Sequence, residues 1–153
     1  MILVKPPFKF EEYDQKIWIF LAGTIDMGNS EDWQKKVEYF FKDNDDVVIF
    51  NPRRDNWDSS WEQKITNPQF KEQVEWELNY LDNSDIIIFN FLPDSKSPVT
   101  MLELGLHVKD NIYVCCPDDF YRSGNIYIIC ERYNIPLFKN LDELLINIFE
   151  KNL

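Results

Sequence analysis

The sequence predicts an α/β fold in which one doubly wound parallel sheet of about five strands carries helices on both faces. Short apolar runs alternate along the chain with segments in which apolar residues have helical spacing, and this alternation is typical of such sheets. The chain has 153 residues, 44% of them hydrophobic, which is enough for one domain with its own core. We expect this domain to span residues 16–153 and residues 1–15, with Pro6 and Pro7, to form an extended arm.

The expected strands are unbroken apolar runs, as in sheets that are buried on both faces. They comprise residues 16–22, 47–50, 86–89, 112–116 and 136–138. The expected helices comprise residues 31–42, a segment beginning at Pro68, and residues 98–108, 125–133 and 141–151. Asn29 or Ser30 is suited to cap the first of these helices, because both side chains accept hydrogen bonds from free backbone N–H groups.

The charge and composition of the chain favour small molecules as ligands. The formal net charge is −11, so nucleic-acid backbones and anionic membrane surfaces would be repelled. The chain has no apolar run that would span a bilayer, and its first ten residues lack the core of a signal peptide, so we expect a cytoplasmic protein. Three cysteines and one histidine give no metal-binding pattern, and we expect reduced cysteines and no metal.

The segment from Ser97 to Val108 contains the most informative residue, Glu103. The Ser97 hydroxyl is suited to cap a helix and Pro98 suits the first helical position. Glu103 is the only formal charge between Pro98 and Val108, and the apolar residues around it predict a largely buried helix. Because an unpaired buried carboxylate is costly, Glu103 is a candidate catalytic residue; alternatively, it faces solvent or pairs with His107.

Glu77 is a second candidate. It shares a predicted helical stripe with Phe70, Val74 and Leu81, so it should face the interior or a cleft, unless its carboxylate reaches out to water. Two carboxyl groups, one ionised and one with a raised pKa, can serve as nucleophile and acid in the cleavage of a glycosidic bond.

Arg53 and Arg54 are candidates for recognising an anion or orienting these carboxylates, although an arginine pair in an Asp-rich loop also suits a structural ion-pair cluster. No loop carries the GxGxxG or GxxxxGK[ST] pattern of a nucleotide cofactor site, and we expect no cofactor.

Five ordered motifs resemble the nucleoside 2-deoxyribosyltransferase family, particularly its transferase-like branch. They are FLAGTIDMG at residues 20–28, EDWQ at 31–34, NPRR at 51–54, QVEWEL at 73–78 and SPVTMLELG at 97–105. The resemblance covers roughly residues 16–133 and implies a flavodoxin-like domain.

The resemblance also implies roles for individual residues. Glu103 stands at the family's nucleophile, and Glu77 at a family acid that is usually Asp. Asn125 resembles an asparagine that binds the 5′ side of the sugar, often across a subunit interface. Ser97 stands where the transferases usually carry an Asp near a sugar hydroxyl, and where related deoxynucleotide N-hydrolases hold a 5′-phosphate with a serine. The other substrate-binding candidates, in the loops after the first two strands of the domain, are Gly23, Asp26 and Arg53.

The implied function is transfer of 2-deoxyribose between nucleobases through a covalent intermediate on Glu103. The partners are then a nucleoside or nucleotide and a free nucleobase, and the resemblance implies a homo-oligomer, a dimer or larger. Two alternatives remain: an N-glycosidase that hydrolyses deoxynucleosides or their 5′-monophosphates, and a non-catalytic nucleotide-binding module.

Overall fold

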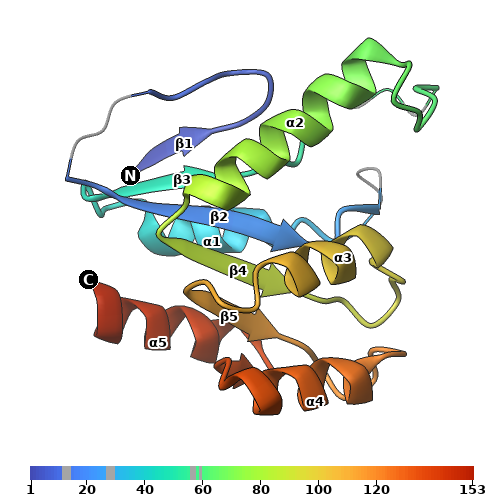
Figure 1. Ribbon diagram of the computed structural model, residues 1–153. Coiled ribbons are helices and arrows are strands. Elements are labelled where there is room, and N and C mark those ends of the chain that lie inside the picture. Colours follow the sequence, from blue (N-terminus) through green and yellow to red (C-terminus); the bar gives the residue numbers. More distant parts are fainter. Residues whose placement is uncertain (12–14, 27–29, 56–57, 59) are drawn as a thin grey trace.

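The computed structural model describes residues 1–11, 15–26, 30–55, 58 and 60–153. Within this part of the chain a six-stranded sheet is flanked by helices (Figure 1). The strands are β1 Ile2–Val4, β2 Ile17–Gly23, β3 Val47–Phe50, β4 Ile86–Asn90, β5 Ile112–Cys115 and β6 Leu137–Phe138. The helices are α1 Gln34–Phe41, α2 Pro68–Asn83, α3 Pro98–Leu106, α4 Ser123–Tyr133 and α5 Leu141–Asn152.

All neighbouring strands are parallel, in the order β1-β3-β2-β4-β5-β6. The chain first builds outward from β2 to β3 and then returns to the other side of β2 with β4. The strand order therefore reverses between β2 and β4, and ligands of doubly wound proteins bind at the carboxyl ends of the strands at such a point. This confirms the predicted sheet class.

Two apolar layers cover the two faces of the sheet. On one face, Trp76, Tyr80 and Leu81 of α2 pack with Leu104 of α3 and Ile126 of α4 against the strands. On the other face, α1 and α5 pack against the alternate strand residues. Figure 1 shows the resulting three layers, with helices on both sides of the sheet.

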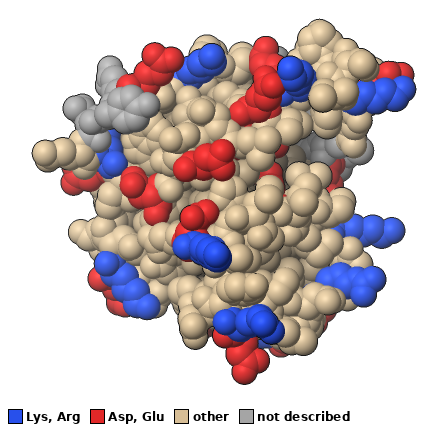
Figure 2. Space-filling view, in the orientation of Figure 1, with Lys and Arg blue, Asp and Glu red and all other residues tan. Residues whose placement is uncertain are grey.

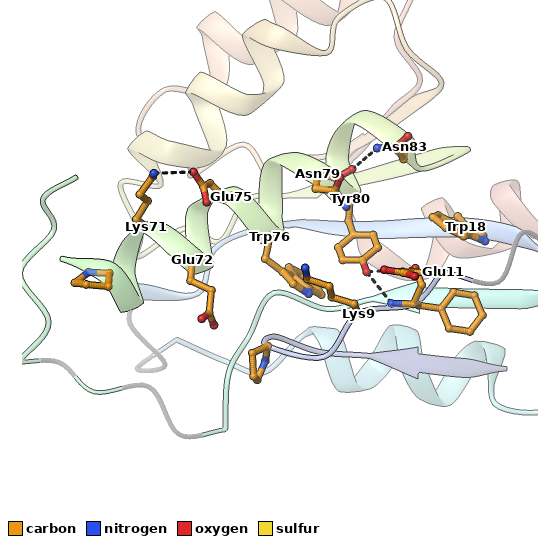
Figure 3. Close-up of a pocket in the computed structure, with 13 residues that line it drawn as sticks. Lys9, Glu11, Trp18, Lys71, Glu72, Glu75, Trp76, Asn79, Tyr80 and Asn83 are labelled. Atoms are coloured by element: carbon orange, nitrogen blue, oxygen red, sulfur yellow. Dashed lines mark hydrogen bonds and ion pairs between the residues drawn. The ribbon is translucent and has the colours of Figure 1, made fainter. Parts of the chain in front are cut away.

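The N-terminal arm adds the sixth strand, which the sequence did not predict. Residues 2–4 pair with β3 at the edge of the sheet, and three residues are too few to give a recognisable strand pattern. Further along the arm, the Tyr80 hydroxyl accepts a hydrogen bond from the Phe10 N–H at 2.8 Å, and Trp76 Nε1 donates to the Phe8 carbonyl at 2.7 Å. Figure 3 shows Trp76 and Tyr80 extending from α2 toward this segment.

The start of the first predicted helix differs from the prediction. The helix expected over residues 31–42 begins only at Gln34, and the Ser30 hydroxyl donates to the Ile25 carbonyl at 3.0 Å instead of capping the helix. The other candidate cap, Asn29, lies outside the described residues. Asn67, in contrast, caps α2 through its side-chain oxygen, which accepts from the N–H groups of Gln69 and Phe70.

The burial predicted for α3 is wrong in one respect. Thr100, Glu103 and Leu104 are buried, but the apolar side chains of Val99, Leu102 and Leu106 are exposed. Apolar residues on several faces of a helix do not distinguish a helix that is buried all round from one that exposes an apolar face for a partner. None of the described helices is long and apolar enough to cross a membrane.

We predict that Gly23→Ala destabilises the protein by about 1–3 kcal/mol, because a Cβ there would collide with the Asn90 carbonyl oxygen and approach the Trp33 ring to 2.7 Å. Urea unfolding measures the effect. Gly105→Ala in α3 is the matched control, since a Cβ there meets no atom within 4 Å. Equal stabilities of the two variants would contradict the close packing at Gly23.

Candidate functional site

A cavity of about 350 Å³ lies at the carboxyl ends of the central strands, next to the junction of β2 and β4. Its size is in the range of small-molecule sites. The loop after β2, the loop after β3, one face of α2 and the first turns of α3 surround it. The polar lining residues that bear on its chemistry are Thr24, Asp26, Gln73, Glu77, Ser97 and Glu103.

Glu103 lies on the side of α3 that faces this cavity, and only 9% of the residue is exposed. Burial raises the pKa of Glu103 to about 8, and the negative charge of Glu77 adds to the increase. The alternative partner His107 lies elsewhere: its Nδ1 is 2.7 Å from Asp110 Oδ2. The structure therefore contradicts a structural Glu103–His107 pair.

Glu77 reaches the same cavity from α2. Its Oε1 accepts a hydrogen bond from Gln73 Nε2 at 2.6 Å. Burial raises the pKa of Glu77 to about 7, while the Gln73 hydrogen bond and the Arg54 charge act in the opposite direction. Since the two carboxyl pKa values lie near 7 and 8, the pair holds a proton at neutral pH. This is the condition under which one carboxyl group acts as an acid and the other as a nucleophile.

A chain of hydroxyl groups forms another wall. Thr24 Oγ1 and Ser97 Oγ are 2.7 Å apart, Ser97 Oγ and Ser95 Oγ are 2.8 Å apart, and Ser95 Oγ donates to Asp26 Oδ1 at 2.9 Å. Each hydroxyl has one proton and an ionised carboxylate only accepts, so Ser97 must donate to Ser95 and Thr24 to Ser97. The Leu92 N–H donates to Thr24 Oγ1 at 3.1 Å and so holds in place the first hydroxyl of this hydrogen-bonded series.

Ser97 does not cap α3 as the sequence predicted. It precedes the helix with φ of 43° and makes no capping hydrogen bond with its side chain. The reason is that its hydroxyl is engaged by Thr24 and Ser95. The N–H groups of Val99 and Thr100 in the first turn are therefore left for water or a ligand at the edge of the cavity.

The remaining predicted site residues divide into two groups. Gly23 and Asp26 line the cavity, whereas Arg53 and Asn125 are not among its lining residues. Arg53 Nη2 donates to the Ser30 carbonyl at 2.9 Å, in the segment before α1, and Asn125 is exposed on α4. Of the described residues that line the cavity, Arg54 is the one with a positive charge.

The polar residues that the sequence analysis missed include Thr24 and Gln73, which line the cavity, and Ser95, which bonds to Ser97 and Asp26. Gln73 had a usable signal, because it precedes Glu77 by four residues on a helix and therefore lies beside it. Thr24 and Ser95 lie in loops, where sequence spacing does not give spatial neighbours.

A larger hollow of about 810 Å³ lies between the arm and the outer side of α2 (Figure 3). Trp76 and Tyr80 are among its lining residues, and the carboxylates at its rim are exposed; Glu75 pairs with Lys71 at 3.3 Å. Size alone therefore does not identify the site, and the buried carboxyl pair favours the smaller cavity. Among the described residues, no group of three or more His, Cys, Asp or Glu side chains is placed to hold a metal ion.

Comparison with known families gives one match. A family model described as nucleoside 2-deoxyribosyltransferase like matches residues 16–120. The matched span includes Glu77 and Glu103 and ends before Asn125. No curated protein matches the chain.

We predict that Glu103→Gln raises the free energy of unfolding at pH 8–9 by more than about 2 kcal/mol, with a smaller gain near pH 5. The pKa of this carboxyl is raised from 4.5 to about 8 by folding, so the folded chain retains a proton that the unfolded chain releases. Stability therefore falls as pH rises from about 4.5 to 8 and then levels off, and glutamine removes this dependence.

Urea unfolding at several pH values measures this effect, with Glu131→Gln, an exposed position on α4, as the control. A gain for Glu103→Gln that is the same at pH 5 and pH 8.5 would contradict the raised pKa.

Proposed function

The chain belongs to the nucleoside 2-deoxyribosyltransferase-like family, and from this membership we propose that it cleaves the N-glycosidic bond of 2′-deoxynucleosides and transfers the sugar to another nucleobase. The observation that carries the proposal is that Glu77, which is partly buried, and Glu103, which is buried, line one cavity at the carboxyl ends of the strands and that both have raised pKa values. A nucleophile and an acid are the two groups that a retaining glycosyl transfer requires.

The mechanism is a double displacement. The ionised carboxylate of Glu103 attacks the anomeric carbon, the bond to the base breaks, and Glu77 gives its proton to the departing base nitrogen. In the second half, a nitrogen of the incoming base attacks the anomeric carbon, the glycosyl ester breaks to restore the Glu103 carboxylate, and Glu77 takes up the proton of the incoming base. No metal or cofactor takes part in these steps.

The proton must lie on Glu77 when the reaction begins. In the free protein burial raises the pKa of both carboxyl groups, so substrate binding has to favour the form in which Glu77 carries the proton and Glu103 is ionised. A base nitrogen placed against Glu77 favours the protonated carboxyl group, because the nitrogen accepts a hydrogen bond from the carboxyl O–H. The positive charge that develops on the sugar ring then favours the ionised form of Glu103 in the transition state.

The hydroxyl chain supports an unphosphorylated sugar. Ser97 donates its hydroxyl proton to Ser95, and Thr24 donates its proton to Ser97. Both oxygens can therefore only accept a further hydrogen bond, which suits the O–H of a sugar hydroxyl. The Asp26 carboxylate at the end of the chain would repel a phosphate.

A second candidate is an N-glycosidase acting on deoxynucleoside 5′-monophosphates. The observation that favours it is the uncapped first turn of α3, whose N–H groups are suited to an anion, together with Arg54 at the cavity. In this case water replaces the incoming base in the second displacement.

We predict that the protein forms deoxyadenosine from deoxyinosine and adenine, and that Glu103→Gln lowers this rate at least about 1000-fold because the nucleophile is lost. Chromatography of released bases and new nucleosides is the measurement. Glu131→Gln is again the matched control.

Deoxynucleoside 5′-monophosphates without an acceptor base form the second arm of this experiment. Free base from the monophosphates alone would favour the N-glycosidase over the transferase. Full activity of pure Glu103→Gln would refute the role of Glu103, and inactivity of the wild-type protein in both arms would refute both enzymatic proposals.

We also propose that a second copy of the chain covers the exposed face of α3, as the resemblance to an oligomeric family implies. Val99, Leu102 and Leu106 are 59%, 65% and 63% exposed and are spaced so that they form one stripe. Figure 2 shows a largely uncharged area over α3. Val99 also lines the cavity, so a partner seated here would stand beside the substrate.

We predict that Leu102→Glu, which places a charge in the middle of this stripe, dissociates the oligomer into 18.4 kDa monomers. Size-exclusion chromatography with light scattering gives the mass. Ile65→Glu, at an exposed apolar position in the loop before α2, is the control. A wild-type protein that is monomeric would contradict the proposal.

A further inference from the structure

Gln73 lies behind Glu77 and makes three hydrogen bonds, although only 3% of it is exposed. Its oxygen accepts from Arg54 Nε at 2.5 Å. Its nitrogen donates to the Pro52 carbonyl at 3.0 Å and to Glu77 Oε1 at 2.6 Å. One buried amide therefore links the loop after β3 to the acid of the cavity.

These partners fix the orientation of the amide. If oxygen and nitrogen were exchanged, the amide N–H groups would face the Arg54 N–H, and the amide oxygen would face the Pro52 carbonyl and the Glu77 carboxyl. The Arg54 contact would then be donor against donor and the Pro52 contact acceptor against acceptor, whatever the protonation state of Glu77. Gln73 must therefore donate to Glu77.

We infer that Gln73 is a positioning residue that holds Oε1 of Glu77 as an acceptor and leaves Oε2 as the oxygen that carries the catalytic proton. This inference rests on the proposed function only in calling the proton catalytic. If Oε1 of Glu77 carried the proton, it would have to accept the Gln73 hydrogen bond through its one remaining lone pair. Protonation of Oε2 leaves the hydrogen bond from Gln73 to Oε1 undisturbed. The acid then has one oxygen, and one direction, from which to donate.

Arg54 supports this arrangement from a second side. Its Nε holds the Gln73 oxygen, and its Nη2 lies 3.0 Å from Glu72 Oε1. Among the described residues, the charged side chains that line the cavity together with Glu77 are Arg54 from the loop after β3, Glu103 from α3 and Asp26 from the loop after β2. Because two of the three are acidic, the donor from Gln73 is needed to keep the Glu77 carboxylate in place when it is ionised.

Two variants separate the donor role of Gln73 from its anchoring role. Gln73→Met keeps the volume and removes both functions. Gln73→Glu keeps an acceptor for Arg54 but cannot donate to Glu77 when it is ionised. Gln69→Met is the matched control, since Gln69 is exposed on the same helix.

The first measurement is the pKa of Glu77 by carbon NMR of the carboxyl group, made in Glu103→Gln protein so that one coupled group is absent. We expect the pKa of Glu77 to rise by about one unit in Gln73→Met and further in Gln73→Glu, because the carboxylate loses a donor. It should not change in Gln69→Met. An unchanged Glu77 pKa in both Gln73 variants would overturn the inference.

The second measurement is steady-state base exchange with Glu103 intact. We expect kcat to fall roughly 10- to 100-fold in both Gln73 variants, with KM nearly unchanged, because the acid is misdirected rather than the substrate lost. Wild-type kcat in Gln73→Glu would show that only anchoring of Arg54 matters and would overturn the inference. A wild-type protein without exchange activity would refute the proposed function, while the NMR result would still decide whether Gln73 positions Glu77.

Discussion

The pairing of β2 with β4 determines where everything else in the site lies. Gly23 is opposite Asn90 at the carboxyl ends of these strands, and the Thr24 N–H donates to the Asn90 carbonyl at 3.0 Å. The absence of a Cβ at Gly23 lets the two backbones and the Trp33 ring meet. This junction directs the loop after β2 toward the start of α3, so that Thr24 reaches the hydroxyl of Ser97.

A buried carboxyl pair is a cost that the surrounding fold must offset. Glu77 and Glu103 come from different helices on the same face of the sheet, and the negative charge of Glu77 adds to the cost of ionising Glu103. Trp76, the residue before Glu77, and Leu104, the residue after Glu103, belong to the hydrophobic layer on this face of the sheet. Their packing holds both helices in place. A site that destabilises its own fold at neutral pH is consistent with a catalytic use, because a structural role is served better by apolar residues.

The helix α3 has two different faces, which join the chemistry to the assembly. One face buries Glu103 in the cavity, and the adjoining face exposes Leu102 and Leu106 to solvent. Val99 belongs to the exposed face and also lines the cavity. A partner chain on this helix would therefore lie beside the substrate, and assembly and turnover would depend on the same element.

The sequence by itself determined the sheet class, the helix that carries Glu103 and the inward direction of Glu77, because these follow from local periodicity and from the cost of a lone charge among apolar residues. Three features became visible only in the folded chain: Ser97 joins a hydroxyl chain, Gln73 donates to Glu77, and one face of α3 is exposed. Those features depend on contacts between loops and helices far apart in the chain, and local spacing holds no information about such contacts.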